Sequence, residues 1–313
     1  MKRIGIIAAG VITGLLAVVL VAPSFIDWTD YRDTFESRLA TLTGRSVSLE
    51  GDVSLALLPR PSLQVAGVQI GSIAGASHSE FVRADAVAVN LAFGPLLSGR
   101  LQFTSIEIIN PIVNAEVLAD GRTTWSLSAA SQQDQFSSSE GGSGLALDLG
   151  IDSLTLIDGT VIYSDATAGT EFVFSGLNAD VRAESVSGPY VVVGGLTALD
   201  LPWNFDVAVG ALPDDQARSV IAKIVSEDAG IAVDISGQFS LGGAVLRGGG
   251  RMSVSGDSAA LSFKALGLVP DKINLPTPVN SAFSVQGKVT LEGKAVDVAD
   301  LQVLFGRATT EGT

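Results

Sequence analysis

Residue types that commonly do chemistry are few in this sequence and do not form a catalytic or metal-binding set. His78 is the only histidine, so a Ser-His-Asp triad or a histidine metal site has no second member. Asp148, Asp152 and Asp158 lack the Asp-x-Asp-x-Asp-Gly spacing of a calcium loop. A carboxylate pair brought together only by folding stays open. We otherwise expect no catalytic residue, no metal, no cofactor and no enzyme.

The elements that would position a binding surface are β-strands, because apolar residues recur with a period of two along most of the chain. The alternation is clear from Val87 to Phe93 and from Leu145 to Ile151. Turn signals separate these runs, for example Asn110-Pro111, Asp120-Gly121 and Asp158-Gly159, the last two as hairpin turns. This spacing is typical of an antiparallel meander. Two packed sheets would bury the same stripes as a sandwich core, and the pattern alone leaves that alternative open.

Three segments depart from the strand pattern. Apolar residues at helical spacing predict an amphipathic helix that begins after Asp27 and ends at Gly44. A second, short helix is expected at Val220 to Val225. Residues 128–144 are rich in Ser, Gln and Gly and predict a flexible linker.

The N-terminal segment has the pattern of a membrane anchor. Lys2 and Arg3 precede an uncharged apolar run, Ile4 to Ala22, and a spanning helix needs about 20 such residues. The position of the basic residues predicts a cytoplasmic N-terminus, with Lys2, Arg3, Trp28 and Tyr31 at the membrane interface. A cleaved signal peptide is the alternative, although Pro23 makes a poor cleavage site.

Composition narrows the classes of partner. The net charge is −14, and such a surface repels nucleic acid and anionic headgroups. Charged residues are 17% of the chain, well below the usual quarter, so a sheet must bury both faces or keep one apolar face for another purpose. The chain has no cysteine, so its stability must come from burial and backbone pairing.

A series of short motifs from Val21 to Leu127 is specific in its order and spacing. The motifs are Pro23-Ser24-Phe25-Ile26-Asp27, Tyr31-Arg32, Leu42-Thr43-Gly44-Arg45, Leu49-Glu50-Gly51-Asp52-Val53, Leu58-Pro59-Arg60-Pro61, Gly94-Pro95-Leu96-Leu97-Ser98-Gly99, Asn110-Pro111, and Asp120-Gly121-Arg122 before Trp125. In this combination the segment resembles the N-terminal domain of the AsmA family of bacterial envelope proteins.

This resemblance implies a mainly β protein of the inner membrane that projects into the periplasm. Its relatives are similar to bridge-like lipid-transfer proteins, in which a long curled antiparallel sheet forms an open apolar groove. We therefore expect phospholipid and envelope proteins as partners, and a role in lipid transport to the outer membrane and in its integrity. A non-enzymatic assembly factor for outer-membrane proteins is the alternative. The groove candidates are Val87, Val89, Leu91, Leu145, Leu147 and Leu149.

The expected organisation follows from these segments. Residues 4–22 form the single transmembrane anchor, 27–127 the AsmA-like β domain and 128–144 the linker. Residues 145–313 continue the antiparallel sheet, which we expect to be truncated at its C-terminal end because the last run stops in mid-strand.

Overall fold

The computed structural model describes residues 32–56, 60–94, 100–126, 146–148, 153–183, 188–211, 217–240, 247–267, 281–292, 295–306 and 308–312. The predicted anchor at 4–22, the linker at 128–144 and the interface residues Lys2, Arg3, Trp28 and Tyr31 lie outside these ranges. Among the helices that are described, none has the length and apolar character needed to cross a bilayer.

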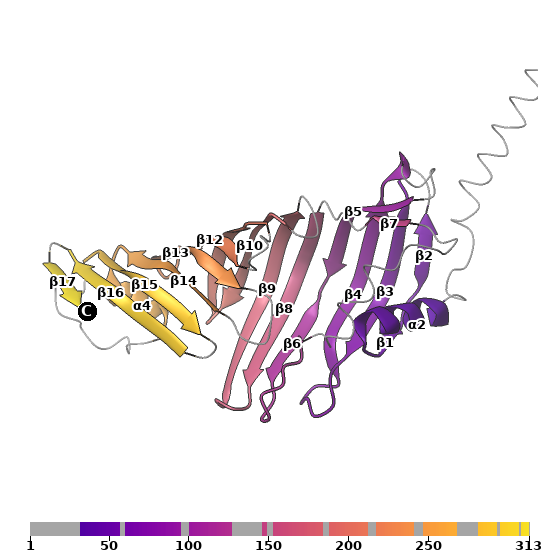
Figure 1. Ribbon diagram of the computed structural model, residues 1–313, viewed down its shortest axis with the longest axis horizontal. Coiled ribbons are helices and arrows are strands. Elements are labelled where there is room, and N and C mark those ends of the chain that lie inside the picture. The colour runs from indigo at the N-terminus through magenta and orange to yellow at the C-terminus, as the bar shows by residue number, and fades with distance from the viewer. Residues whose placement is uncertain are drawn as a thin grey trace, which may run out of the picture. The chain divides into compact units, whose positions relative to one another are not determined.

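The described residues are mainly β, with seventeen strands, and the mainly β prediction is confirmed. They divide into two compact units (Figure 1). The first contains Met1–Leu154 and Ile162–Thr170, and the second contains Thr155–Val161 and Glu171–Thr313. The division therefore falls within strands β8 and β9.

The described part of the first unit begins with helix α2 and continues with a mostly antiparallel sheet. The elements are α2 (Arg32–Thr43), β1 (Val47–Leu49), β2 (Val53–Ala56), β3 (Ser62–Gly71), β4 (Glu80–Leu91), β5 (Arg100–Ile109), β6 (Ile112–Val117) and β7 (Ala146–Asp148). Gly44, at φ 67°, ends α2 as predicted, and its N–H donates to the Ala40 carbonyl. Strand β7 runs parallel to β5, which departs from the expected meander.

The core of the first unit lies where α2 meets the sheet. Val47, Leu49 and Val53 are buried, and Ala40 of α2 packs against them with residues of β3. Gly51 lies between β1 and β2. A Cβ at Gly51 would lie 2.5 Å from the Cβ of Ala66, so only glycine allows this close approach.

The second unit consists of antiparallel strands in sequence order. They are β8 (Ser153–Asp165, shared between the units), β9 (Thr170–Ala183), β10 (Tyr190–Ala198), β11 (Leu201–Val209), β12 (Arg218–Ser226), β13 (Ile231–Ser240), β14 (Arg247–Gly256), β15 (Phe283–Glu292), β16 (Ala295–Phe305) and β17 (Ala308–Gly312). From β9 to β17 each strand pairs with the next in antiparallel register. The antiparallel meander is present throughout this run.

Two local expectations were wrong. Residues 220–225 are strand β12 and not a helix, since four of the six residues are β-branched and the segment pairs with both neighbouring strands. Asp158-Gly159 lies inside β8 and is not a hairpin turn. Asp158 has the positive φ of 53° that a turn would use, but the strand continues through it. Its N–H donates to Asn178 Oδ1 at 3.1 Å.

Helix α4 (Ala259–Ala265) is the element that the periodicity did not indicate. Ser258 caps its first turn by accepting a hydrogen bond from the Leu261 N–H at 3.3 Å. Ala259, Ala260 and Ser262 are buried, so one side of this short helix packs against the sheet.

Candidate functional site

One face of the second unit's sheet is apolar from β9 to β16. The register places Val207 opposite Val192 on one side and Ala222 on the other. Directly paired residues project to the same side of an antiparallel sheet, so each such series forms a row on one face. The first row is Val181, Val192, Val207, Ala222, Ile235 and Met252.

Two further rows lie beside the first and complete what we call the apolar face. The second is Ala179, Gly194, Phe205, Ile224, Val233, Val254, Val285 and Val303. The third is Ala183, Tyr190, Val209, Val220, Gly237, Gly250, Val289 and Val298. These rows contain no charged residue.

The opposite face carries charged residues, and three exposed apolar side chains, Val191, Val193 and Ile221, also lie on it. The row of residues that alternates with the apolar ones is Asp180, Val193, Asp206, Lys223, Asp234, Ser253, Gln286 and Gln302. Gln286 and Gln302 are hydrogen-bonded to each other at 2.6 Å. The unit therefore has one face suited to water and one suited to an apolar ligand or a packing partner.

Most of the apolar face is only half-buried. Ala222 is 7% exposed, but Val207, Ile235 and Met252 are intermediate, and Val298 on β16 is 53% exposed. A sandwich core would bury such residues almost completely. This face thus remains within reach of a ligand.

Helix α4 covers one end of the apolar face. Ala259 of α4 forms a buried cluster with Ala229, Ile231 and Phe283. Phe263 packs against this cluster, and its ring centre lies 6.3 Å from that of Phe283. Trp203, on β11, also contacts the cluster. Val233, Val254 and Val285 of the second row pack against this cluster, so the first and third rows lie farther from α4.

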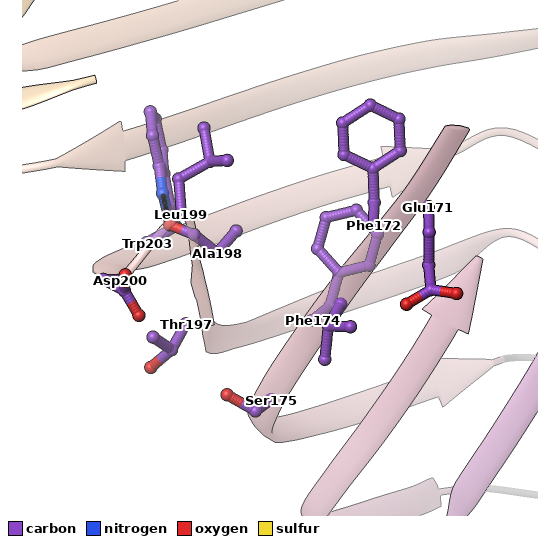
Figure 2. A pocket seen from close by; sticks show the side chains of 10 residues that line it. Glu171, Phe172, Phe174, Ser175, Thr197, Ala198, Leu199, Asp200 and Trp203 are labelled. Atoms are coloured by element: carbon purple, nitrogen blue, oxygen red, sulfur yellow. Dashed lines mark hydrogen bonds between the residues drawn. The ribbon is translucent and has the colours of Figure 1, made fainter. Parts of the chain in front are cut away.

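A pocket of about 590 Å³ adjoins this end of the face (Figure 2). It lies between the start of β9 and the β10–β11 hairpin, and its lining residues are Glu171, Phe172, Val173, Phe174, Ser175, Thr197, Ala198, Leu199, Asp200 and Trp203. Its volume is in the range of small-molecule sites.

The hairpin beside the pocket has an unusual turn. Leu199 and Asp200 have φ values of 53° and 59°, the left-handed region that glycine or asparagine usually fills in a two-residue hairpin loop. Leu199 is also 61% exposed, although it is a large apolar residue. The Trp203 indole N–H donates to the Ala198 carbonyl at 3.2 Å and so orients the ring.

The candidate residues predicted from sequence lie in the first unit. Val87 pairs with Val65 and Ile108, and Val89 pairs with Leu63 and Ile106, so both lie on half-buried apolar rows.

Leu91 is also half-buried, but it follows a register shift and pairs with Phe103. Leu147 is on β7, opposite Leu101, and its side chain lies outside the described residues, as do Leu145 and Leu149 entirely.

Sequence reasoning missed the second unit as the place where accessible apolar rows gather. Alternation along most of the chain predicted strands, but a row depends on cross-strand register, which alternation within one strand does not show. The pocket was missed because Leu199-Asp200 is not a turn signal.

Comparison with known proteins gives one family. The model of the AsmA family matches residues 1–241, which is more than half of the chain. No curated protein and no solved structure matches significantly.

Proposed function

Because this chain belongs to the AsmA family, we propose that it binds phospholipid acyl chains along the apolar face and supports lipid transport to, and integrity of, the outer membrane. The observation that carries the proposal is the set of uncharged, half-exposed rows that cross the second unit from β9 to β16. The family match ends at residue 241, just after β13, so it includes the strands that contribute most residues of these rows.

Burial of an acyl chain on this face would supply the binding free energy. Each methylene removed from water contributes about 0.8 kcal/mol, so a chain held over several strands offsets much of the cost of leaving a bilayer. The polar row on the other side keeps the sheet soluble in water while the ligand is bound. The proposed action is passive and uses no catalytic residue.

The location follows from the N-terminal pattern. Lys2 and Arg3 before the apolar run at 4–22 support an inner-membrane anchor with the rest of the chain in the periplasm. There the partners would be phospholipid, the inner membrane and envelope proteins. The same proposal includes a curled sheet that forms an open groove, as the family resemblance implies.

Native mass spectrometry of the full chain, gently extracted from a bacterial membrane, tests acyl-chain binding. We expect bound phospholipid in a defined ratio. Ile235→Asp places a charge on the apolar face and should lower the occupancy at least about tenfold, because a carboxylate next to an acyl chain is strongly unfavourable. Ser236→Asp is the matched control, since Ser236 is exposed on the polar face of the same strand.

Folding must be checked in parallel. Val298→Asp serves as a second variant, because Val298 is 53% exposed and tolerates a polar residue more easily. Folded wild-type chain without any bound lipid would overturn the proposal and favour the assembly-factor alternative. Equal occupancy in both apolar-face variants and the control would also contradict it.

A further inference from the structure

The pocket beside the β10–β11 hairpin combines apolar and acidic groups. Its apolar lining includes Phe172, Phe174 and Trp203, whereas its only charged lining residues are Glu171 and Asp200. Within the described part of the chain, neither carboxylate forms an ion pair. A ligand for this pocket must therefore present an apolar surface. It must also be compatible with two carboxylates, either by tolerating them or by carrying a positive charge.

These groups are segregated within the pocket. Figure 2 shows the side chains of Phe172, Leu199 and Trp203 projecting to one side, with the carboxylates of Glu171 and Asp200 directed to the other. Since the Trp203 N–H is already bonded to Ala198, the indole offers its ring faces and not a donor. The carboxylates, and not the aromatic rings, are therefore the groups that would attract an ammonium group.

The pocket also adjoins the apolar face. Trp203 pairs with Leu196, and Ala198 pairs with both Leu201 and Phe174, so these residues extend the rows of that face to the end of β9–β11. An acyl chain lying on the face could thus place its polar end at the pocket.

We propose that this pocket binds the ammonium group of an amphiphile, such as an ethanolamine-type phospholipid headgroup, while its chain lies on the apolar face. The inference rests on the proposed function, because it names the headgroup for the same ligand. Anionic headgroups without an ammonium are disfavoured by the two carboxylates. A metal cation is disfavoured as well, since the described residues contain no group of three potential ligands among His, Cys, Asp and Glu.

The backbone of the hairpin supports a binding role. Leu199 and Asp200 both have positive φ, a conformation that costs free energy for residues other than glycine and that accumulates at functional sites. The turn holds Asp200 at the pocket and leaves Leu199 exposed beside it.

Fluorescence of Trp203 provides the test. The chain has three tryptophans, so Trp28→Phe and Trp125→Phe leave Trp203 as the single indole in the full chain. Two lysophospholipids with the same brominated acyl chain are titrated, one with an ethanolamine and one with a glycerol headgroup. Bromine quenches the indole on contact. We expect the ethanolamine lipid to bind up to about fivefold more tightly, the effect of an ion pair with exposed carboxylates.

Charge-neutral variants identify the source of the preference. Glu171→Gln with Asp200→Asn should abolish it, and asparagine still accepts the positive φ at position 200. Asp206→Asn with Asp234→Asn is the control, because it also removes two negative charges, here from the polar row on β11 and β13. Its preference should persist.

The outcomes separate the two claims. Equal binding of both lipids, or a preference that survives in the double variant, would overturn the ammonium site while leaving acyl-chain binding in place. Absence of quenching by either lipid in the folded chain would overturn the proposed function and, with it, this inference. Free ethanolamine that competes as well as the lipid would show a small-amine site and contradict an amphiphile site.

Discussion

The guanidinium of Arg45 lies over the ring of Phe81, with its Cζ atom 4.8 Å from the ring centre. The same group donates hydrogen bonds to the carbonyl oxygens of Gly71, Thr124 and Ser126. Burial lowers the pKa of Arg45 from its ordinary value, but the group stays charged. One side chain just after α2 thus joins the end of β3, strand β4 and the segment that follows β6.

Arg45→Ala should therefore loosen the first unit. Loss of the ring contact and of several hydrogen bonds to backbone carbonyls predicts a decrease of about 1–3 kcal/mol in the free energy of unfolding. Arg45→Lys should retain only part of the lost free energy of unfolding, because an ammonium cannot reach the same carbonyls in a planar arrangement. Urea unfolding measures both. Arg38→Ala, at an exposed position on α2, should change the free energy by less than about 0.5 kcal/mol. An equal effect at both positions would contradict this role for Arg45.

Thr124 is the second test of stability, because it is 1% exposed and its hydroxyl bonds two backbone groups of β6. The hydroxyl accepts from the Glu116 N–H at 2.8 Å and donates to the Asn114 carbonyl at 2.9 Å. Thr124→Val keeps the shape but leaves both backbone groups without this partner, and should cost about 1–3 kcal/mol. Thr124→Ser keeps the hydroxyl and should cost less. If valine is tolerated as well as serine in thermal unfolding, the hydrogen bonds are not important.

Glycines bring β13 and β14 close together on the apolar face. A Cβ at Gly250 would lie 2.8 Å from Gly237 Cα and would also clash with the Ser236 carbonyl, which are backbone atoms that cannot move aside locally. At the neighbouring Gly249 the nearest atom would be 3.5 Å away. Gly250→Ala should lower the free energy of unfolding by about 1–3 kcal/mol, and Gly249→Ala should be nearly neutral. Chemical denaturation of the two variants decides this, and equal stability would rule out the close approach.

Asp300 has a testable pKa. It lies at a register shift between β15 and β16, and its hydrogen bond to Lys288, together with that residue's charge, lowers its pKa below the ordinary value of 3.8. Because the folded-state pKa is the lower one, the pair stabilises the fold above the unfolded pKa and loses this effect as the pH falls through the folded pKa. Both groups are exposed, so the effect on stability is small.

An NMR titration of the Asp300 carboxyl carbon measures this pKa directly. Lys288→Met should raise the Asp300 pKa towards 3.8, whereas Lys223→Met, on β12, should leave it unchanged. A pKa that does not respond to loss of Lys288 would contradict the pairing.

The fold was predictable where a signal is local. Alternation indicated the strand type, Gly44 the end of α2, and Asn110-Pro111 the break between β5 and β6, where Asn110 has a φ of 49°. Asp158-Gly159 misled because a positive φ serves an irregularity within a strand as well as a turn. Residues 220–225 misled because a short apolar run fits either period, and only pairing on both sides distinguishes the strand.

The candidate site was less predictable, because it depends on long-range register. Val207 and Met252 lie in one row only because three intervening strand pairs are in register, and no local pattern contains that information. Helix α4 is seven residues long, too short for a clear helical period, yet it decides which end of the apolar face is covered.

Photo-crosslinking in bacterial cells tests the central claim most directly. Val207 and Asp206 are neighbours on β11 but lie in the apolar and the polar row, respectively. With a photoreactive amino acid placed at either position in the full chain, we predict phospholipid crosslinks from position 207 and only background from position 206. Crosslinks of equal yield from both positions, or none from position 207 in folded protein, would contradict acyl-chain binding on the apolar face.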